Sequence, residues 1–215
     1  MIISCMGHAK FVIELDNGLR IVTDPYDASC GYPVTANPAD VVLVSHQHHD
    51  HNAVETIPGH PRVIDRAGDF DLGGGAAVRA IEAYHDDQQG KLRGKTLLFC
   101  LKAEGLTVMH LGDLGHMLTT EQRLLLGSAD IVMLPVGGYY TIDALAAAAL
   151  VREIRPRVVI PMHYRDGNRG ARRLEHIDAF TDYFEAPEMI HHYQTNSIII
   201  DHDSEPQVAV LKYMG

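Results

Sequence analysis

The chain has 215 residues, enough for one well-buried domain, and 46% of them are hydrophobic against 21% charged. Its formal net charge of −10 argues against nucleic acid as a partner, because phosphate binding normally needs a basic face. No apolar run reaches the roughly 20 residues of a membrane span, and the 3 cysteines are too few and too widely spaced for a disulfide framework. We therefore expect one soluble domain over residues 1–215, with free thiols in a reducing cytoplasm.

Most of the predicted elements are short strands separated by turns. Short apolar runs rich in β-branched residues are typical of buried strands. They cover residues 2–5, 10–15, 20–23, 41–45, 62–65, 77–83, 96–101, 107–111, 131–135 and 158–162. Turns are expected at 16–18 and at the glycines of 73–75.

Helices are expected only in the second half of the chain. A Thr-x-x-Gln capping box begins a predicted helix over 119–126. Thr141 can cap a second helix over 142–154, rich in alanine and leucine. Apolar residues near helical spacing predict a third over 172–184. Strands and helices together indicate an α/β fold.

The densest group of metal-ligand residue types directly follows the strand predicted over 41–45. His46 and His48 are two residues apart, so in an extended chain they project to one side and can share a metal ion. The chain must then turn, which lets Asp50 and His51 face a second ion. His49 lies between ligand positions and is expected to face solvent. A His-rich surface loop would not explain this spacing, so the motif predicts half of a dinuclear metal site.

Three further residues repeat this placement at the ends of later predicted strands. His85, Asp113 and His163 each lie just past an apolar run. Each would more often be structural if it stood alone. Because sites form at the carboxyl ends of strands in α/β folds, together they can supply the missing ligands. Asp86 competes with His85 for its position.

These motifs resemble the metallo-β-lactamase superfamily, and within it the branch of ascorbate-6-phosphate lactonase and the N-acylphosphatidylethanolamine-hydrolysing phospholipases. The segments that carry the resemblance, in the expected order, are Gly-His-Ala at 7–9, Thr-Asp-Pro at 23–25, the motif at 46–51, Gly-Asp at 112–113, Leu-Pro-Val-Gly-Gly at 134–138 and Pro-Met-His-Tyr at 161–164. The resemblance implies a four-layer αβ/βα sandwich with the site at one edge.

The resemblance also implies a ligand set for two divalent transition-metal ions, zinc first, with manganese and iron suited to the same ligands. One ion would be held by His46, His48 and His85. The other would be held by Asp50, His51 and His163, and Asp113 would bridge them.

A pair of metal ions of this kind predicts hydrolysis. The ions lower the pKa of a shared water, so a bridging hydroxide can attack an ester, lactone, amide or phosphodiester bond of a small-molecule substrate. Asp50 could also orient the hydroxide or return a proton to the leaving group. By the resemblance His8 could reach the substrate side, and an exposed turn histidine is the alternative. His116, three residues after Asp113, either lies near the metals or starts the helix predicted at Thr119.

Other polar residues have open roles at this stage. Asp24 either accepts a hydrogen bond from a ligand histidine or caps a turn. Arg165 either receives an anionic group of the substrate or is solvated. Tyr139, Tyr140 and neighbouring residues could line the pocket. No feature of the sequence indicates an oligomeric state.

Functions from other classes are also compatible with parts of this pattern. Relatives of this fold include iron-dependent oxidoreductases, but the full set of seven ligands favours two metals over one iron. A nuclease would need an insertion or arm for which the compact acidic chain has no room. A non-catalytic metal-binding protein would be expected to lack a ligand, and none is missing here. The identity of the bound metal would separate these alternatives.

Overall fold

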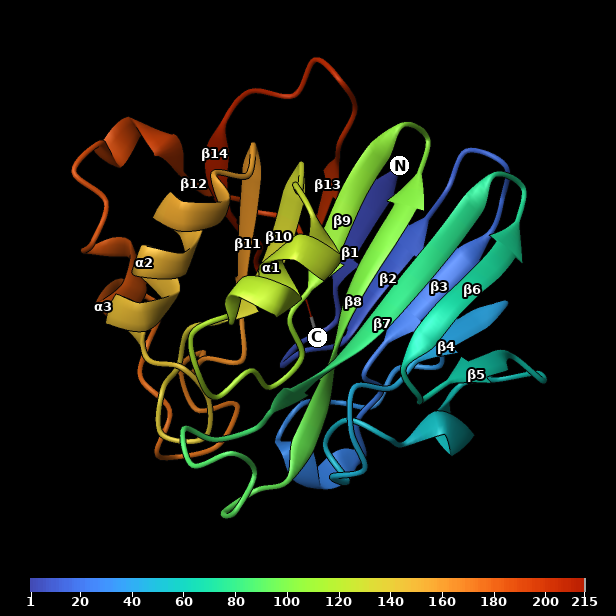
Figure 1. The fold of residues 1–215 in the computed structure, drawn as a ribbon, viewed down its shortest axis with the longest axis horizontal. Helices are drawn as coiled ribbons and strands as arrows, with labels where there is room; N and C mark the ends of the chain where they lie inside the picture. Colours follow the sequence, from blue (N-terminus) through green and yellow to red (C-terminus); the bar gives the residue numbers. More distant parts are fainter. Residues whose placement is uncertain (215) are drawn as a thin grey trace.

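The structure is a computed structural model that describes residues 1–214. Two β-sheets lie face to face, with helices on the outer side of one of them (Figure 1). The first sheet has the order β13 (Ser197–Ile199), β1 (Ile2–Cys5), β2 (Phe11–Glu14), β3 (Arg20–Thr23), β4 (Val41–Leu43), β5 (Arg62–Ile64). The second has the order β12 (Ile190–His192), β14 (Gln207–Val210), β11 (Val158–Met162), β10 (Ile131–Pro135), β9 (Leu106–His110), β8 (Lys95–Ala103), β7 (Ala76–Tyr84), β6 (Gly68–Gly73).

The main hydrophobic core lies between the two sheets. Side chains alternate along a strand, so every second residue of a facing strand points into this space. Ile3 and Phe11 from the first sheet belong to the same buried cluster as Phe99 and Ile160 from the second. Burial of this apolar surface is the main term that holds the sheets together.

The outer layers on the two sides differ in helix content. Three helices, α1 (Thr120–Leu126), α2 (Ala144–Ile154) and α3 (Asp178–Thr181), pack on the outer face of the second sheet and enclose a further buried cluster. Within residues 1–214, the first sheet is covered outside by loops and the short 3-10 helix η2 (Val54–Thr56), with Ile57 packed beneath it. The expected four-layer α/β sandwich is confirmed, and one of its outermost layers is small.

The first two predicted helices form with small changes at their ends. α1 has the predicted capping box, in which the Thr119 hydroxyl accepts from the Gln122 amide and the Gln122 side chain accepts from the Thr119 amide. α2 starts later than predicted, and its cap is Asp143, not Thr141. The Asp143 carboxylate accepts from the amide of Ala146 at 2.8 Å. A carboxylate is a strong helix cap, and it fixes the start of α2 at Ala144, two residues into the predicted segment.

The third predicted helix was largely wrong. Of residues 172–184 only α3, four residues long, is α-helical. Glu175 instead donates its amide to Gly137 at 2.9 Å and accepts from the amide of Arg165 at 2.8 Å, and Arg165 and His176 form a β-bridge. These bonds to distant backbone replace the local helical ones, and tertiary context overrides the helical spacing of the apolar residues.

Strand directions bring the ends of several strands to one edge of the sandwich. β3 and β4 are parallel, as are β9, β10 and β11. β7 runs antiparallel to β8, which runs antiparallel to β9, so β7 and β9 have the same direction. The segments that follow β4, β7, β9 and β11 therefore gather at a common edge. No helix in the described part of the chain, residues 1–214, combines the length and apolarity needed to cross a membrane.

Candidate metal centre

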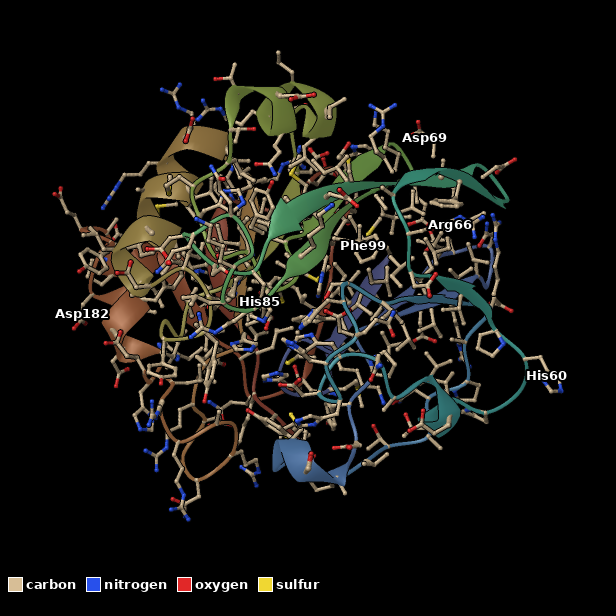
Figure 2. The ribbon with its side chains drawn as sticks, turned by 60° about the horizontal axis from the view of Figure 1, so that its bottom comes forward. His60, Arg66, Asp69, His85, Phe99 and Asp182 are labelled. Carbon is tan, nitrogen blue, oxygen red and sulfur yellow. The ribbon has the colours of Figure 1, made fainter. Side chains whose placement is uncertain are left out.

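Seven histidine and aspartate side chains gather at this edge, on the segments after four strands. We call them the His/Asp cluster: His46, His48, Asp50, His51, His85, Asp113 and His163. In Figure 2, His85 lies near the middle of the molecule, where loops converge, whereas His60 projects from the periphery. The cluster thus joins residues from both sheets.

One part of the cluster consists of three histidines. His46, His48 and His85 each offer a ring nitrogen, and these nitrogens lie within 4.8 Å of one another. Nε2 of His46 is 2.9 Å from Nδ1 of His48. Donor atoms on one tetrahedral zinc ion are roughly 3.3 Å apart, given Zn–N bonds of about 2.0–2.1 Å. The arrangement fits a single metal ion.

A second part lies beside the first and includes one residue more than expected. Asp50, His51 and His163 have donor atoms within 4.8 Å of one another, and His8 belongs to the same group. Nε2 of His8 is 3.3 Å from Oδ2 of Asp50. Its ring also lies 4.2 Å, between centroids, from that of His163. His8 therefore lies against the His/Asp cluster as well as in the wall of the pocket in front of it.

Asp113 lies between the two parts. Its Oδ2 atom is 3.2 Å from Nε2 of His85, 3.2 Å from Nε2 of His163 and 3.3 Å from Nε2 of His51. Nε2 of His46 is 3.9 Å away. One carboxylate oxygen is thus shared by histidines of both parts, which is where a bridging ligand must lie.

Unpartnered buried atoms in the cluster test whether metal ions fit. Several polar atoms there have no hydrogen-bond partner among residues 1–214, including Nε2 of His51, Oδ1 of Asp113 and Nδ1 of His8. Buried polar atoms left without partners cost free energy, and native proteins rarely keep several together. Imidazole nitrogens and carboxylate oxygens are the donors that divalent transition metals take. The residues present fit such ions.

Asp24 orients two of the histidines from behind. Its buried carboxylate accepts from Nδ1 of His51 at 2.9 Å and from the Ser45 hydroxyl at 2.7 Å. The Ser45 oxygen is also 2.9 Å from Nδ1 of His46. Because the hydroxyl proton is directed to Asp24, this oxygen accepts from His46. Both rings are therefore held with Nε2 toward the cluster, as a carboxylate behind a metal ligand does.

His110, to which sequence analysis assigned no role, holds two turns of the site together. Its Nε2 lies 3.0 Å from the carbonyl of Ala9, and its Nδ1 accepts from the amide of Gly112 at 3.2 Å. Gly112 has φ +46°, and an added Cβ would lie 2.7 Å from the carbonyl oxygen of Leu97. Only glycine fits there, which places Asp113 deep in the site.

Burial sets the ionisation of three histidines at the site. It lowers the pKa of His8 to about 4, with repulsion from His163 adding to the effect. It lowers the pKa of His46 to about 3, helped by His51. The pKa of His48 is lowered for the same main reason. Neutral imidazole is the form that binds metal ions, so these rings are ready to do so at neutral pH.

The carboxylates and His51 have the opposite tendency. Burial alone would raise the pKa of Asp50 and of Asp113, but adjacent histidines outweigh it and hold both below the ordinary value. Burial would lower the pKa of His51, yet Asp113 and Asp24 on either side raise it well above the ordinary value. The carboxylates therefore make the cavity attractive to positive charge. In this structure that charge is the proton on His51, and a metal ion would take its place in a loaded site.

A pocket of about 470 Å³ opens in front of the cluster. Its lining includes His8, His48, Asp50, His85, Asp113 and His163 from the site, and Ser29, Cys30, Gly31, His49, Arg93, Tyr140, Gly170 and Ala171 around it. Residues from several loops far apart in the sequence build the wall. This volume suits a small molecule.

Asp86, the alternative to His85 as a ligand, accepts backbone hydrogen bonds within its own loop instead. Its Oδ1 accepts from the amides of Gln88 and Gly90, and its Oδ2 from those of Leu92 and Arg93, all at 2.8–2.9 Å. Both carboxylate oxygens are thereby occupied by backbone donors. The structure brings His85, not Asp86, to the cluster.

Three other residues considered in the sequence lie outside the His/Asp cluster. His116 lies apart from the cluster: Nε2 accepts from the Tyr84 amide and Nδ1 lies 2.7 Å from the Met117 carbonyl. Arg165 donates to the carbonyl of Gly167 and is absent from the pocket wall. His49 is exposed, as expected, although it touches the pocket rim.

Comparisons with known proteins identify the family of the chain. The chain matches the family model for the beta-lactamase superfamily domain over residues 2–163. It is 32% identical over 201 residues to a UPF0173 metal-dependent hydrolase of Pyrococcus furiosus, covering 75% of this chain and 84% of that one. A UPF0173 metal-dependent hydrolase of Archaeoglobus fulgidus is 29% identical over 201 residues, covering 76% and 83%.

Solved structures have the same fold. A proposed Zn-dependent hydrolase of the metallo-β-lactamase superfamily from Thermotoga maritima superimposes with a TM-score of 0.81 and 34% identity, over 98% of this chain and 97% of that one. The family match spans every residue of the His/Asp cluster, from His46 to His163. The chain belongs to the metallo-β-lactamase superfamily and, within it, to the UPF0173 metal-dependent hydrolases.

Proposed function

We propose that the His/Asp cluster holds two divalent metal ions and that the protein hydrolyses an ester, lactone, amide or phosphodiester bond of a small molecule. The observation that carries the proposal is the position of Asp113 Oδ2, within 3.9 Å of four histidine Nε2 atoms from both parts of the cluster. The imidazole and carboxylate donors suit zinc, and manganese and iron fit the same set.

The ligand assignment follows the two groups of donor atoms. His46, His48 and His85 would hold one ion, and Asp50, His51 and His163 the other, with Asp113 between them. Two bound ions would lower the pKa of a shared water and polarise the oxygen of the bond to be cleaved.

Asp50 and His8 would have roles in proton transfer. Asp50 is the one carboxylate of the cluster that is partly open to the pocket, with 28% of its side chain exposed against 3% for Asp113. It can accept a proton on the pocket side and return it to a leaving group. His8, neutral at pH 7, lies 3.3 Å from Asp50 and orients that carboxylate. His116 has no part in this proposal.

Metal content and hydrolysis measured on the same preparations test the proposal. We expect about two zinc ions per chain by plasma mass spectrometry, and hydrolysis of at least one member of a panel of lactones, thioesters, N-acyl amides and phosphodiesters that chelation abolishes. Asp113→Ala should lose bound metal, and its activity should fall by at least about 100-fold, more than is typical of residues behind the ligands.

His60→Ala is the matched control, because His60 is exposed at the periphery (Figure 2). It should keep wild-type metal content and activity. Full metal occupancy in Asp113→Ala, or hydrolysis that chelation leaves intact, would overturn the proposal.

A further inference from the structure

Arg93 is the cation in the wall of the pocket that contains the cluster. It is half-buried, and it is absent from the ion pairs and side-chain hydrogen bonds of residues 1–214. Other arginines differ: Arg79 lies 2.6 Å from Asp69 and Arg157 lies 3.4 Å from Asp130. A half-buried guanidinium with free donors is costly unless an anion joins it.

Two tyrosines support the Arg93 side chain without using its donors. Its guanidinium carbon lies 5.5 Å from the ring centre of Tyr140 and 5.9 Å from that of Tyr139. A cation held over aromatic rings is attracted to their faces and spends none of its N–H donors on them. The guanidinium donors of Arg93 therefore remain available for hydrogen bonds to an oxyanion.

The loop that carries Arg93 is held in place by the Asp86 carboxylate. Asp86 accepts four backbone hydrogen bonds from within the loop, including one from the amide of Arg93 itself at 2.8 Å. The Arg93 backbone is thus fixed next to His85, a residue of the cluster. Preorganisation of this kind reduces the entropy lost when a ligand is bound.

A second arginine lies close to the same pair of tyrosines. Arg173 is over the Tyr139 ring, 4.6 Å from its centre. The chain as a whole carries a formal charge of −10, so two arginines on neighbouring tyrosines are not a general property of its surface. With two divalent ions bound as proposed above, the negative charges of Asp50 and Asp113 in the pocket would be offset, and Arg93 would then favour an anionic ligand.

We propose that Arg93 binds an oxyanion of the substrate, a carboxylate or phosphate group separate from the bond that is cleaved. This proposal names the substrate class for the function proposed above and rests on it. Arg93 is then a specificity-determining residue, and Asp86 is a positioning residue that acts through it. The anion is held at the pocket wall while the scissile bond faces the cluster.

Anion binding by the zinc-loaded protein tests this inference. Calorimetric titrations would use propionate, methylphosphonate and the uncharged propionamide, none of which carries a readily hydrolysed bond. We expect one or both anions to bind and propionamide not to bind. Arg93→Gln should raise the dissociation constant for the bound anion by about 10-fold or more, the loss typical of a charge-assisted hydrogen bond. Arg93→Lys should have an intermediate effect, because it keeps the charge and loses the paired geometry.

Arg172→Gln is the matched control, with the same charge change at an exposed side chain outside the pocket wall. It should change the dissociation constant by less than about 2-fold. All variants should keep wild-type zinc content. Comparing propionate with methylphosphonate identifies the preferred oxyanion as a carboxylate or a phosphate-like group.

The inference and the proposed function fail in distinguishable ways. Unchanged anion binding in Arg93→Gln, absence of anion binding in the wild type, or equal binding of propionamide overturns the role of Arg93, even if metal-dependent hydrolysis is found. A larger loss in Arg165→Gln than in Arg93→Gln also overturns it. Loss of anion binding in Arg93→Gln without hydrolysis of any substrate supports the binding site and counts against the proposed function alone.

Discussion

At the scale of single residues, Asp24 links the two parts of the cluster without belonging to it. It has φ +39°, an unusual backbone conformation for a residue other than glycine, and none of its surface is exposed. Hydrogen bonds from the Ser45 amide, the Ser45 hydroxyl and His51 stabilise it in this position. Such strain is often tolerated where a side chain must be aimed at a site.

Asp24→Asn is expected to weaken metal binding by about 10- to 100-fold while keeping the volume of the side chain. The amide lacks the negative charge that holds Nδ1 of His51, so Nε2 loses its fixed direction toward the metal. Competition with a chromophoric zinc chelator would measure the change. Asp69→Asn, at an exposed ion pair on β6, is the control and should match the wild type. An unaltered zinc affinity in Asp24→Asn would contradict the orienting role.

The residues of the site differ in how far the sequence predicts them. His46, His48, Asp50 and His51 form a local pattern after an apolar strand, so spacing alone brings them to attention. Arg93 carries no such pattern. Its role depends on Asp86, which folds its loop, and on tyrosines more than forty residues away in the chain. Contacts of this kind arise only in the folded protein.

At the scale of elements, most strands that are buried on both faces were predicted well, although β14, which is also wholly buried, was missed. β10 and β11 consist wholly of buried residues and appear as unbroken apolar runs. β6 and the short strands β12 to β14 were missed. β6 has no fully buried residue, and β12 has two exposed residues out of three, so neither displays a clear pattern. The segment 172–184 has apolar residues near helical spacing but does not form a continuous helix. Its backbone at Glu175 is hydrogen-bonded to Arg165 and Gly137 instead.

A segment without regular structure can also be fixed by one buried side chain. Residues 31–40 connect η1 (Ala28–Cys30) to β4, and Lys10 anchors them by donating from Nζ to the carbonyl of Thr35 at 2.8 Å. Burial lowers the pKa of Lys10 from its ordinary 10.5 to about 8. Below pH 8 the ammonium is charged in both the folded and unfolded states, so folding carries the cost of burying it. Between about pH 8 and 10.5 the unfolded chain binds more protons, and stability must rise with pH.

Lys10→Met should remove this pH dependence. As pH rises from about 8 to 10.5, the free energy of unfolding of the wild type should increase relative to that of the variant. The difference in pKa sets the upper limit of this increase at roughly 3 kcal/mol. Urea unfolding of both proteins across this range measures the difference, and all other titrating groups cancel in the comparison. Parallel stability curves would show that Lys10 is not the group responsible.

At the scale of the whole molecule, the cluster lies where the two sheets meet. Its first four residues follow β4 of the first sheet, and the other three follow β7, β9 and β11 of the second. The main core holds the sheets together along their faces. Metal ions bound at the edge would add a second connection and would neutralise buried carboxylates that otherwise repel each other.

Removal of the metal should therefore destabilise the entire fold as well as abolish activity. Free zinc at about 1,000 times its dissociation constant stabilises the folded state by roughly 4 kcal/mol per site. For a chain of this size each kcal/mol corresponds to about 2–4 °C, so chelation should lower the melting temperature by at least about 8 °C. Differential scanning calorimetry before chelation, after chelation and after zinc is restored would measure the loss and its recovery. Hydrogen exchange should increase in loops of both sheets, at 46–51, 111–115 and 161–165. A melting temperature that stays constant while metal content falls would mean that the core alone holds the sheets, and that the cluster contributes to chemistry but not to the stability of the fold.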